Sequence, residues 1–396
     1  MTPVLRSFTH DTWQDGGGPA RPLLDAATGE TVALLPETGP DPATMLGHAR
    51  RVGGPALGAL TFTERAAILK ALAKHLSGHL EEFAQLSTRT GATRRDTAVD
   101  VDGGIGTLAV HASKAARELP DAAVLPDGAT EPLGRGGTFA GRHVLVPRQG
   151  VAVQINAYNF PVWGMLEKFA PAFLDALTAQ DTLAFVPSAL ADAVCGAVSE
   201  RLERIVVDPC RDGTDMGPLA GLDRRDEVRA AVARLSAEAK LVCGDPGRVE
   251  VAGADPERGA SIAPILLRCD DPSTAAPHEV EAFGPVSTLL PYDDLDEVIG
   301  AAALGGGSLA GSIVTADPEA ARTLVRGLAP WHGRLLVLNR DDAAESTGHG
   351  VAMPQMLHGG PGRAGGGEEL GGLRALDHYL RRTAVQGHPD FLDGLA

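Results

Sequence analysis

The sequence is poor in several kinds of residue, and each scarcity excludes a class of protein. Aromatic residues make up only 4% of the 396 residues, so a folded core has to be built mainly from Ala, Val and Leu. A formal net charge of −16 leaves no concentrated basic face of the kind that binds nucleic acid. The charge therefore argues against nucleic acid as a partner. No apolar run approaches the ~20 residues that a membrane-spanning helix requires, so a membrane is not expected as a partner either.

Cysteine is also scarce, and its spacing excludes a disulfide framework or a zinc site. The four cysteines are scattered over residues 195–269 without any C-x-x-C pair: Cys195, Cys210, Cys243 and Cys269. Such spacing is typical of reduced thiols. The N-terminus carries no apolar signal core, which adds to the expectation of a cytoplasmic protein without a bound metal.

The most informative stretch that is present runs from Val151 to Phe173, V-A-V-Q-I-N-A-Y-N-F-P-V-W-G-M-L-E-K-F-A-P-A-F. Its first residues alternate as in a β-strand, a turn follows at 156 to 161, and the apolar residues after Pro161 repeat with helical spacing. Ligands and polarising groups lie at such strand-to-helix turns in α/β proteins. An Asn in a turn serves more often to form the turn than to stabilise an oxyanion, so both interpretations of Asn159 stay open.

The rest of the pattern predicts an α/β chain. Residues 1 to 40 predict a β-hairpin with its turn at Thr28 to Glu30, and residues 61 to 90 predict one helix that a Thr61/Glu64 capping pair begins and Gly91 ends. A second helix is expected at 105 to 118, followed by a loop at 120 to 137. Further segments, given in chain order, predict strands at 143–148, 151–155, 240–243, 262–267, 286–291, 308–315 and 335–339, and helices at 226–239 and 317–328.

Several ordered stretches are similar to the aldehyde dehydrogenase superfamily. The sequence I-N-A-Y-N-F-P-V-W-G-M-L-E-K resembles the N-F-P motif of this superfamily. The resemblance is strongest to the CoA-linked semialdehyde dehydrogenases of aerobic phenylacetate and benzoate breakdown. Matching stretches lie at 53–74, 102–108, 278–286 and 358–374. The resemblance implies an aldehyde-dehydrogenase-like α/β fold, shortened, with an incomplete dinucleotide-binding half, a remaining catalytic-type α/β domain and an oligomerisation arm.

The resemblance assigns roles to three residues and suggests others. Asn159 would help to hold an oxyanion, and Glu281 with Phe283 would form a vestigial or working coenzyme-ribose site; without the motif, Glu281 is more simply an exposed turn acid. The resemblance places the polar stretches 345–350 and 358–360 at the substrate entrance, where His349 and His358 are candidate acids or bases. A solvated glycine-rich loop is the other interpretation of these stretches, and it stays open. Three basic residues are candidates for contact with a CoA phosphate: Arg142, Arg148 and Lys168.

The catalytic core of the resembling family is not found. The G-Q-x-C-T nucleophile motif is absent, and only Cys210, beside Arg211 in a loop, is a candidate for a reactive thiol. No glycine-rich turn follows Phe185, and Val186 stands where the family has a ribose-binding lysine. The residues from Val186 onward resemble the family's segment beyond the catalytic cysteine. Two segments that are distant in the family sequence therefore look joined near Ala184 to Pro187. The 122 positions from Asn159 to Glu281 leave no room for the missing βαβ units, each of about 30 residues. The sequence E-L-G-G at Glu369 is also found around the family's general base, but the neighbouring residues resemble the family's C-terminal segment, so Glu369 is not predicted to be a base.

These features predict four parts and leave four hypotheses. The parts are a helical and hairpin region (1–136), an arm strand with the N-F-P turn and helix (137–186), a catalytic-type α/β domain (187–374) and a C-terminal oligomerisation strand (375–396).

The leading hypothesis is a homologue without dehydrogenase activity and without a cofactor, which binds or converts a reactive aldehyde or thioester of an aromatic-acid type pathway. The alternatives are a cofactor-independent enzyme that uses Asn159, an NADP-dependent CoA-linked semialdehyde dehydrogenase, and a non-enzymatic assembly partner of a full-length paralogue. In the resembling family an arm strand pairs with a neighbouring subunit, so the resemblance of residues 143–148 and 379–386 to that arm implies a dimer or a hetero-oligomer.

Overall fold

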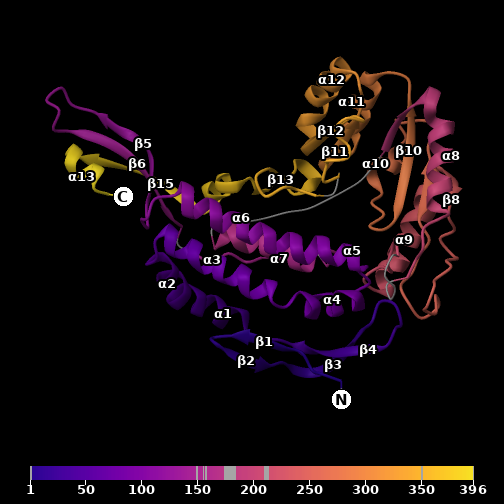
Figure 1. The fold of residues 1–396 in the computed structure, drawn as a ribbon, viewed down its shortest axis with the longest axis horizontal. Helices are drawn as coiled ribbons and strands as arrows, with labels where there is room; N and C mark the ends of the chain where they lie inside the picture. Colours follow the sequence, from indigo (N-terminus) through magenta and orange to yellow (C-terminus); the bar gives the residue numbers. More distant parts are fainter. Residues whose placement is uncertain are drawn as a thin grey trace.

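A computed structural model describes residues 2–148, 150–154, 156, 158–173, 184–208, 214–348 and 351–395. The elements form an arch, in which a layer of helices lies between a projecting arm and an upright α/β part (Figure 1). The N-terminal strands lie along the outer side of the helices. The predicted mixed α/β class is confirmed.

The N-terminal strands form two antiparallel hairpins, β1 (Arg6–Thr9) with β2 (Thr12–Asp15), and β3 (Gly17–Leu24) with β4 (Thr31–Thr38). The second is the predicted hairpin. Its turn is closed by the Asp25 N–H, which donates to the Glu30 carbonyl at 2.8 Å, and Gly29 adopts a positive φ of 70°. A β-carbon at Gly29 would lie 2.6 Å from the Arg258 carbonyl oxygen, so this turn needs glycine on two grounds.

The helical layer departs from the single helix predicted at 61–90. The capping box of Thr61 and Glu64 is confirmed, but the helix ends at Ser77 and a new one begins at Leu80, because the backbone leaves helical geometry at His79, directly after Gly78. The helices of the layer are α1 (Pro42–His48), α2 (Gly54–Gly58), α3 (Phe62–Ser77), α4 (Leu80–Arg89), α5 (Arg94–Thr97), α6 (Gly103–Glu118) and α7 (Pro161–Ala172). The predicted helix at 105–118 corresponds to α6.

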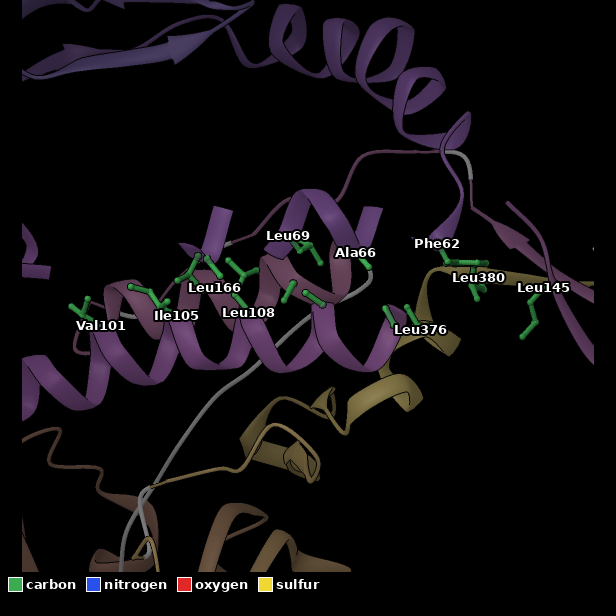
Figure 2. Close-up of a cluster of buried hydrophobic side chains, with 14 residues drawn as sticks. Phe62, Ala66, Leu69, Val101, Ile105, Leu108, Leu145, Leu166, Leu376 and Leu380 are labelled. Carbon is green, nitrogen blue, oxygen red and sulfur yellow. The ribbon is translucent and has the colours of Figure 1, made fainter. Parts of the chain in front are cut away.

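The core of the layer is a row of apolar side chains where α3, α6 and α7 meet. Leu69, Leu108 and Ala170 are fully buried there, and Figure 2 shows the row continuing to Leu145 and Leu380 at the base of the arm. One cluster therefore joins the helices to the arm. Burial of a large aliphatic side chain contributes about 1.5–3 kcal/mol, so this cluster is a principal source of stability.

The arm is a three-stranded antiparallel sheet in the order β15 (Leu380–Gly387), β6 (Ala140–Pro147), β5 (Leu125–Pro132). The expected pairing of the C-terminal run with the arm is confirmed, with Leu380 opposite Pro147 and Gly387 opposite Ala140. The prediction of a plain loop at 120–137 was wrong, because β5 pairs along β6. Helix α13 (Pro389–Asp393) follows β15.

The predicted strand at 151–155 was wrong for the residues that the structure describes. Residues 151–154 and 156 are irregular, and Val153 is 64% exposed. The alternating pattern is there, but a strand also needs backbone groups of a neighbour to pair with, and none of the described strands lies alongside.

The α/β part contains the remaining predicted elements. A four-stranded sheet has the order β7 (Ala184–Pro187), β10 (Val286–Tyr292), β9 (Ile265–Arg268), β8 (Lys240–Cys243), and β11 (Ser308–Val314) pairs in parallel with β12 (His332–Leu338). The helices are α8 (Ala191–Leu202), α9 (Leu222–Leu235), α10 (Ala275–Glu279), α11 (Leu295–Leu304) and α12 (Pro318–Leu328). A small hairpin of β13 (Leu357–Gly359) and β14 (Glu368–Leu370) connects this part to the helical layer.

Candidate functional site

The turn that carries Asn159 is fixed by a carboxylate from another segment. Asp100 accepts hydrogen bonds from the backbone N–H groups of Val162 (3.2 Å) and Trp163 (2.7 Å), the first turn of α7. Burial raises the pKa of Asp100, and the two hydrogen bonds oppose that shift. The start of α7 is therefore held from the direction of α6, which leaves Asn159 itself exposed.

Two glycines allow α6 to approach α7 closely enough for this arrangement. A β-carbon at Gly103 would lie 2.8 Å from the Trp163 ring, and one at Gly104 would lie 2.8 Å from the Trp163 Cα. Contacts this short are not tolerated, so the D-G-G-I-G-T-L stretch has a packing role beside the N-F-P turn.

The structure brings the Asn159 turn to the predicted ribose-site loop. The ring of Tyr158, next to Asn159, lies 5.6 Å from the ring of Phe283 at an interplanar angle of 59°. The Arg224 guanidinium lies 5.6 Å from the centre of the Tyr158 ring and donates to Glu227 at 2.5 Å. Partial burial raises the pKa of Tyr158. Sequence reasoning missed Tyr158 and Arg224, since neither stands in a catalytic motif.

Glu281 and Phe283 are both exposed on the loop between α10 and β10. The loop packs against α9, where a β-carbon at Gly284 would lie 2.8 Å from a Val228 methyl. Asn159, Glu281 and Phe283 thus belong to one exposed surface. Whether Glu281 binds a ribose stays a prediction.

His358 does not join that surface. It lies on β13 with 9% of its area exposed, and its Nδ1 lies 3.5 Å from a carboxylate oxygen of Glu167 on α7. Glu167 follows Asn159 by eight residues, which at 1.5 Å per helical residue places it on the order of 10 Å along α7. A direct contact of His358 with a ligand held by Asn159 is therefore not supported.

Glu167 is the centre of a buried polar cluster that links α7 to the C-terminal part. Its other oxygen lies 3.4 Å from the Lys168 Nζ, which also donates to the Gly164 carbonyl at 3.1 Å. Lys168 is only 1% exposed, so its suggested contact with a CoA phosphate was wrong. The adjacent charged pair in an otherwise apolar helix was the sequence signal for this cluster.

Two further basic groups lie near Glu167. Burial lowers the pKa of His111 on α6, whose Nδ1 donates to the Thr107 carbonyl at 3.0 Å, and it also lowers the pKa of Arg334 on β12. In both groups the Glu167 carboxylate acts in the opposite direction and favours the charged form.

The described cysteines are packing residues. Cys195 and Cys269 are buried in apolar clusters, and Cys243 lies with its Sγ 3.9 Å from the Ser199 carbonyl oxygen. The two remaining candidates, Cys210 and His349, lie outside the described residues. Arg142 and Arg148 contact Leu392 and Leu380 within the arm, so they are remote from the N-F-P turn.

Two surface depressions lie away from Asn159. One of about 430 Å³ lies between α3 and α6 and is lined by Lys70 and Ile105, and one of about 700 Å³ lies at the arm beside Arg148. No group of three metal-ligating side chains occurs in the part of the chain that the structure describes. None of its helices is long and apolar enough to span a membrane.

Comparison with known proteins decides the family. The sequence profile of the aldehyde dehydrogenase family matches residues 13–176 and 179–385. The chain belongs to the aldehyde dehydrogenase family. The sequence-based prediction of the superfamily is confirmed.

Two relatives in this family differ in how much of them the chain covers. It is 30% identical to the 3,4-dehydroadipyl-CoA semialdehyde dehydrogenase of Aromatoleum evansii, over 90% of this chain and 93% of that enzyme. It is 50% identical to Protein MaoC of Klebsiella aerogenes over 179 residues, 45% of this chain and 52% of that protein. The first alignment runs over 478 positions, whereas 90% of this chain is about 356 residues, so about 120 of those positions lack a counterpart here.

Solved aldehyde dehydrogenases share the fold at low identity. Aldehyde dehydrogenase 21 of Physcomitrella patens, in complex with succinate, has a TM-score of 0.78 at 17% identity over 98% of this chain and 99% of that one. The NAD+ complex of the Bacillus cereus enzyme has a TM-score of 0.79 at 16% identity over 97% and 96%.

Two of the described helix N-termini do not fit the pyrophosphate of a bound dinucleotide. A pyrophosphate binds at a helix N-terminus whose N–H groups are free and follow a glycine-rich turn. The helices after β10 and β11 begin instead with acidic caps, where Asp294 accepts from Glu297 N–H at 2.9 Å and Asp317 accepts from Glu319 N–H at 2.8 Å. These carboxylates occupy the donors and repel a phosphate, so neither end provides the family's coenzyme cradle.

Proposed function

We propose that this chain alone is an aldehyde dehydrogenase homologue without dehydrogenase activity, which keeps an exposed surface for a reactive aldehyde or thioester. The observation that carries the proposal is the placement of the thiols. Oxidation in this family's manner needs an accessible cysteine beside the oxyanion donor. Among the described residues, Cys195 and Cys269 are buried in apolar clusters, and the partly buried Cys243 packs against one with its thiol 3.9 Å from the Ser199 carbonyl oxygen.

Three other observations support the same conclusion. The sequence has no G-Q-x-C-T motif, the described helix N-termini after β10 and β11 carry acidic caps, and Val186 stands in place of the family's ribose-binding lysine. The substrate class follows from the relative at 30% identity, whose name gives a CoA-linked semialdehyde. The chain would bind such a compound, or the thioester derived from it, at the surface of Asn159, Tyr158 and Phe283.

The first test is turnover by the purified chain. With 3,4-dehydroadipyl-CoA semialdehyde and either NAD+ or NADP+, the expected result is no reduced nicotinamide above the rate without protein. Sustained production of NADH or NADPH would contradict the proposal and show that the chain has dehydrogenase activity.

The second test is binding. Asn159→Ala removes one side-chain amide from the exposed surface, and loss of one hydrogen bond of about 0.5–1.5 kcal/mol corresponds to roughly 2- to 13-fold weaker binding of a CoA thioester. Calorimetric titration measures this change. Asn156→Ala is the matched control, since Asn156 is also exposed in the same segment. Equal affinities of the two variants for the CoA thioester would show that Asn159 does not contribute to binding.

A further inference from the structure

The two faces of the arm are covered differently. Successive side chains of a strand point to opposite faces of a sheet, and one face of the arm carries Leu145 and Leu380, which reach the core at its base (Figure 2). On the other face, α13 lies over the part towards the tip, where the Arg142 guanidinium donates to the Leu392 carbonyl at 3.3 Å. The base of that face borders the depression of about 700 Å³. Its lining consists of Gly58 at the end of α2 and four residues at the base of the arm: Val146, Pro147, Arg148 and Arg381.

Arg148 and Arg381 are neighbours on this second face. Arg381 stands opposite Val146 in the pairing of β15 with β6, and the Arg148 N–H donates to the Tyr379 carbonyl at 2.7 Å. Because side chains alternate, Val146, Arg148 and Arg381 share a face, and the two arginines are diagonal neighbours across the strands. Long side chains at such positions are within reach of one another, so two like charges there repel. The pair is unfavourable unless a negative charge lies close by.

The other two arginines of the arm strands have carboxylate partners. Arg142 pairs with Asp393 at 3.5 Å, and Arg382, which is adjacent to Arg381 but on the opposite face, pairs with Asp127. Neither arginine at the depression has such a partner in the part of the chain that the structure describes. Two positive charges therefore stay uncompensated beside a hollow, on a chain whose formal net charge is −16.

The arm itself holds one of these two side chains in place. The Arg148 Nε donates to the Leu380 carbonyl at 3.2 Å, and its two terminal nitrogens have no partner among the described residues. A side chain that is anchored before a ligand arrives loses less conformational entropy when the ligand binds. Arg148 is therefore prepared to bind an anion with its terminal nitrogens.

The chemistry of the two side chains indicates which anion fits. A guanidinium binds phosphate through two parallel N–H···O bonds, a geometry that an ammonium group does not offer. We propose that Arg148 and Arg381 bind the phosphate groups of a small molecule in this depression, and that Val146 and Pro147 contact its less polar part. The ligand is phosphate, either free or carried by a larger molecule. The site lies in the arm, apart from the surface of Asn159, and the inference does not depend on the proposed function.

Calorimetric titration with inorganic pyrophosphate tests the site. The wild-type chain is expected to bind pyrophosphate at one site, with an affinity that falls as sodium chloride is raised, because salt screens exposed charges. Arg381→Gln removes one guanidinium and should weaken binding by at least about tenfold. Absence of binding by the wild-type chain at millimolar pyrophosphate would overturn the proposal.

Arg382→Gln is the matched control. It makes the same change of charge at the next residue, on the opposite face, where Asp127 is the partner. The affinity of this variant for pyrophosphate should equal that of the wild type. Equal weakening by Arg381→Gln and Arg382→Gln would show that only the overall charge of the arm matters, and would refute the site.

A measurement on the wild-type chain does not depend on the folding of a variant. Phenylglyoxal modifies accessible arginines, and pyrophosphate should protect Arg148 and Arg381 from it but not Arg382, as read by peptide mass spectrometry. Equal modification of the three arginines with and without pyrophosphate would contradict the proposal.

Two further comparisons identify what occupies the depression. Competition between coenzyme A and pyrophosphate would indicate phosphate carried by a larger molecule, and lack of competition would indicate free phosphates; the site stands in both cases. A second copy of the chain is the rival occupant. If Arg381→Gln lowers the mass of the protein in sedimentation and leaves pyrophosphate binding unchanged, the two arginines contact a second copy and the proposal is wrong.

Discussion

The start and the middle of α7 contact the C-terminal half of the chain by different means. At its start, the exposed rings of Tyr158 and Phe283 meet at 5.6 Å, with Arg224 beside them. About halfway along α7, Glu167 meets His358 in a buried polar cluster. A partly exposed aromatic contact can open and admit a ligand at small cost, whereas a buried charge cluster cannot. The start of α7 is suited to binding, and its middle is suited to holding the arch together.

Removal of the buried carboxylate should have the largest effect. Glu167→Ala takes a negative charge from beside Lys168 and His358, which stay buried, and is expected to lower the free energy of unfolding by about 3 kcal/mol. Urea denaturation measures the change. Met165→Ala, an exposed position on the same helix, is the control and should change it by less than about 1 kcal/mol. Equal effects of the two substitutions would show that Glu167 has no special structural role.

The next effect concerns pH and His111 near the same cluster. Burial lowers the pKa of His111 in the folded protein, while the unfolded chain binds a proton with a pKa of about 6.5. Stability should therefore fall as the pH drops below about 6.5, by up to ~1.4 kcal/mol per pH unit for this one proton.

A comparison of variants isolates that contribution. His111→Gln should flatten the dependence of unfolding free energy on pH between 6.5 and 5 relative to the wild type, whereas His75→Gln, at an exposed position on α3, should preserve it. Identical pH slopes for wild type and His111→Gln would contradict the assignment.

The exposed end should show the smallest effect on stability. A double-mutant cycle with Tyr158→Ala and Phe283→Ala is expected to give a coupling energy of about 0.5 kcal/mol, the low end for aromatic pairs because both rings are over 40% exposed. Affinity for a CoA thioester should respond more strongly than stability. A coupling energy above about 2 kcal/mol would show that the contact of Tyr158 with Phe283 stabilises the fold as strongly as the cluster around Glu167, and would contradict the difference proposed between them.

The sequence predicted those features that depend on local chemistry. The capping box of Thr61, the hairpin turn at Gly29 and the helix after Pro161 follow from the residues themselves. The pairing of the arm strands came from the family resemblance, since no local pattern relates residues more than 100 positions apart. The contact between Tyr158 and Phe283 was not predicted.

The errors share a physical cause, which is the dependence of an element on its partner. Residues 151–154 alternate like a strand but have no described strand beside them, and residues 125–132 look like a loop but pair with β6. The cluster around Glu167 was missed because charged residues are expected on surfaces. Its burial depends on β12 and β13, which follow α7 by more than 150 residues.

The most direct measurement of the central claim is thermal unfolding of the purified chain with and without saturating NAD+ or NADP+. A ligand that binds the folded state raises its stability by about 2.7 kcal/mol at 100 times the dissociation constant. The account predicts one cooperative transition whose midpoint does not change with either nucleotide. A midpoint that rises by several degrees and saturates with nucleotide concentration would show a coenzyme site and contradict the account.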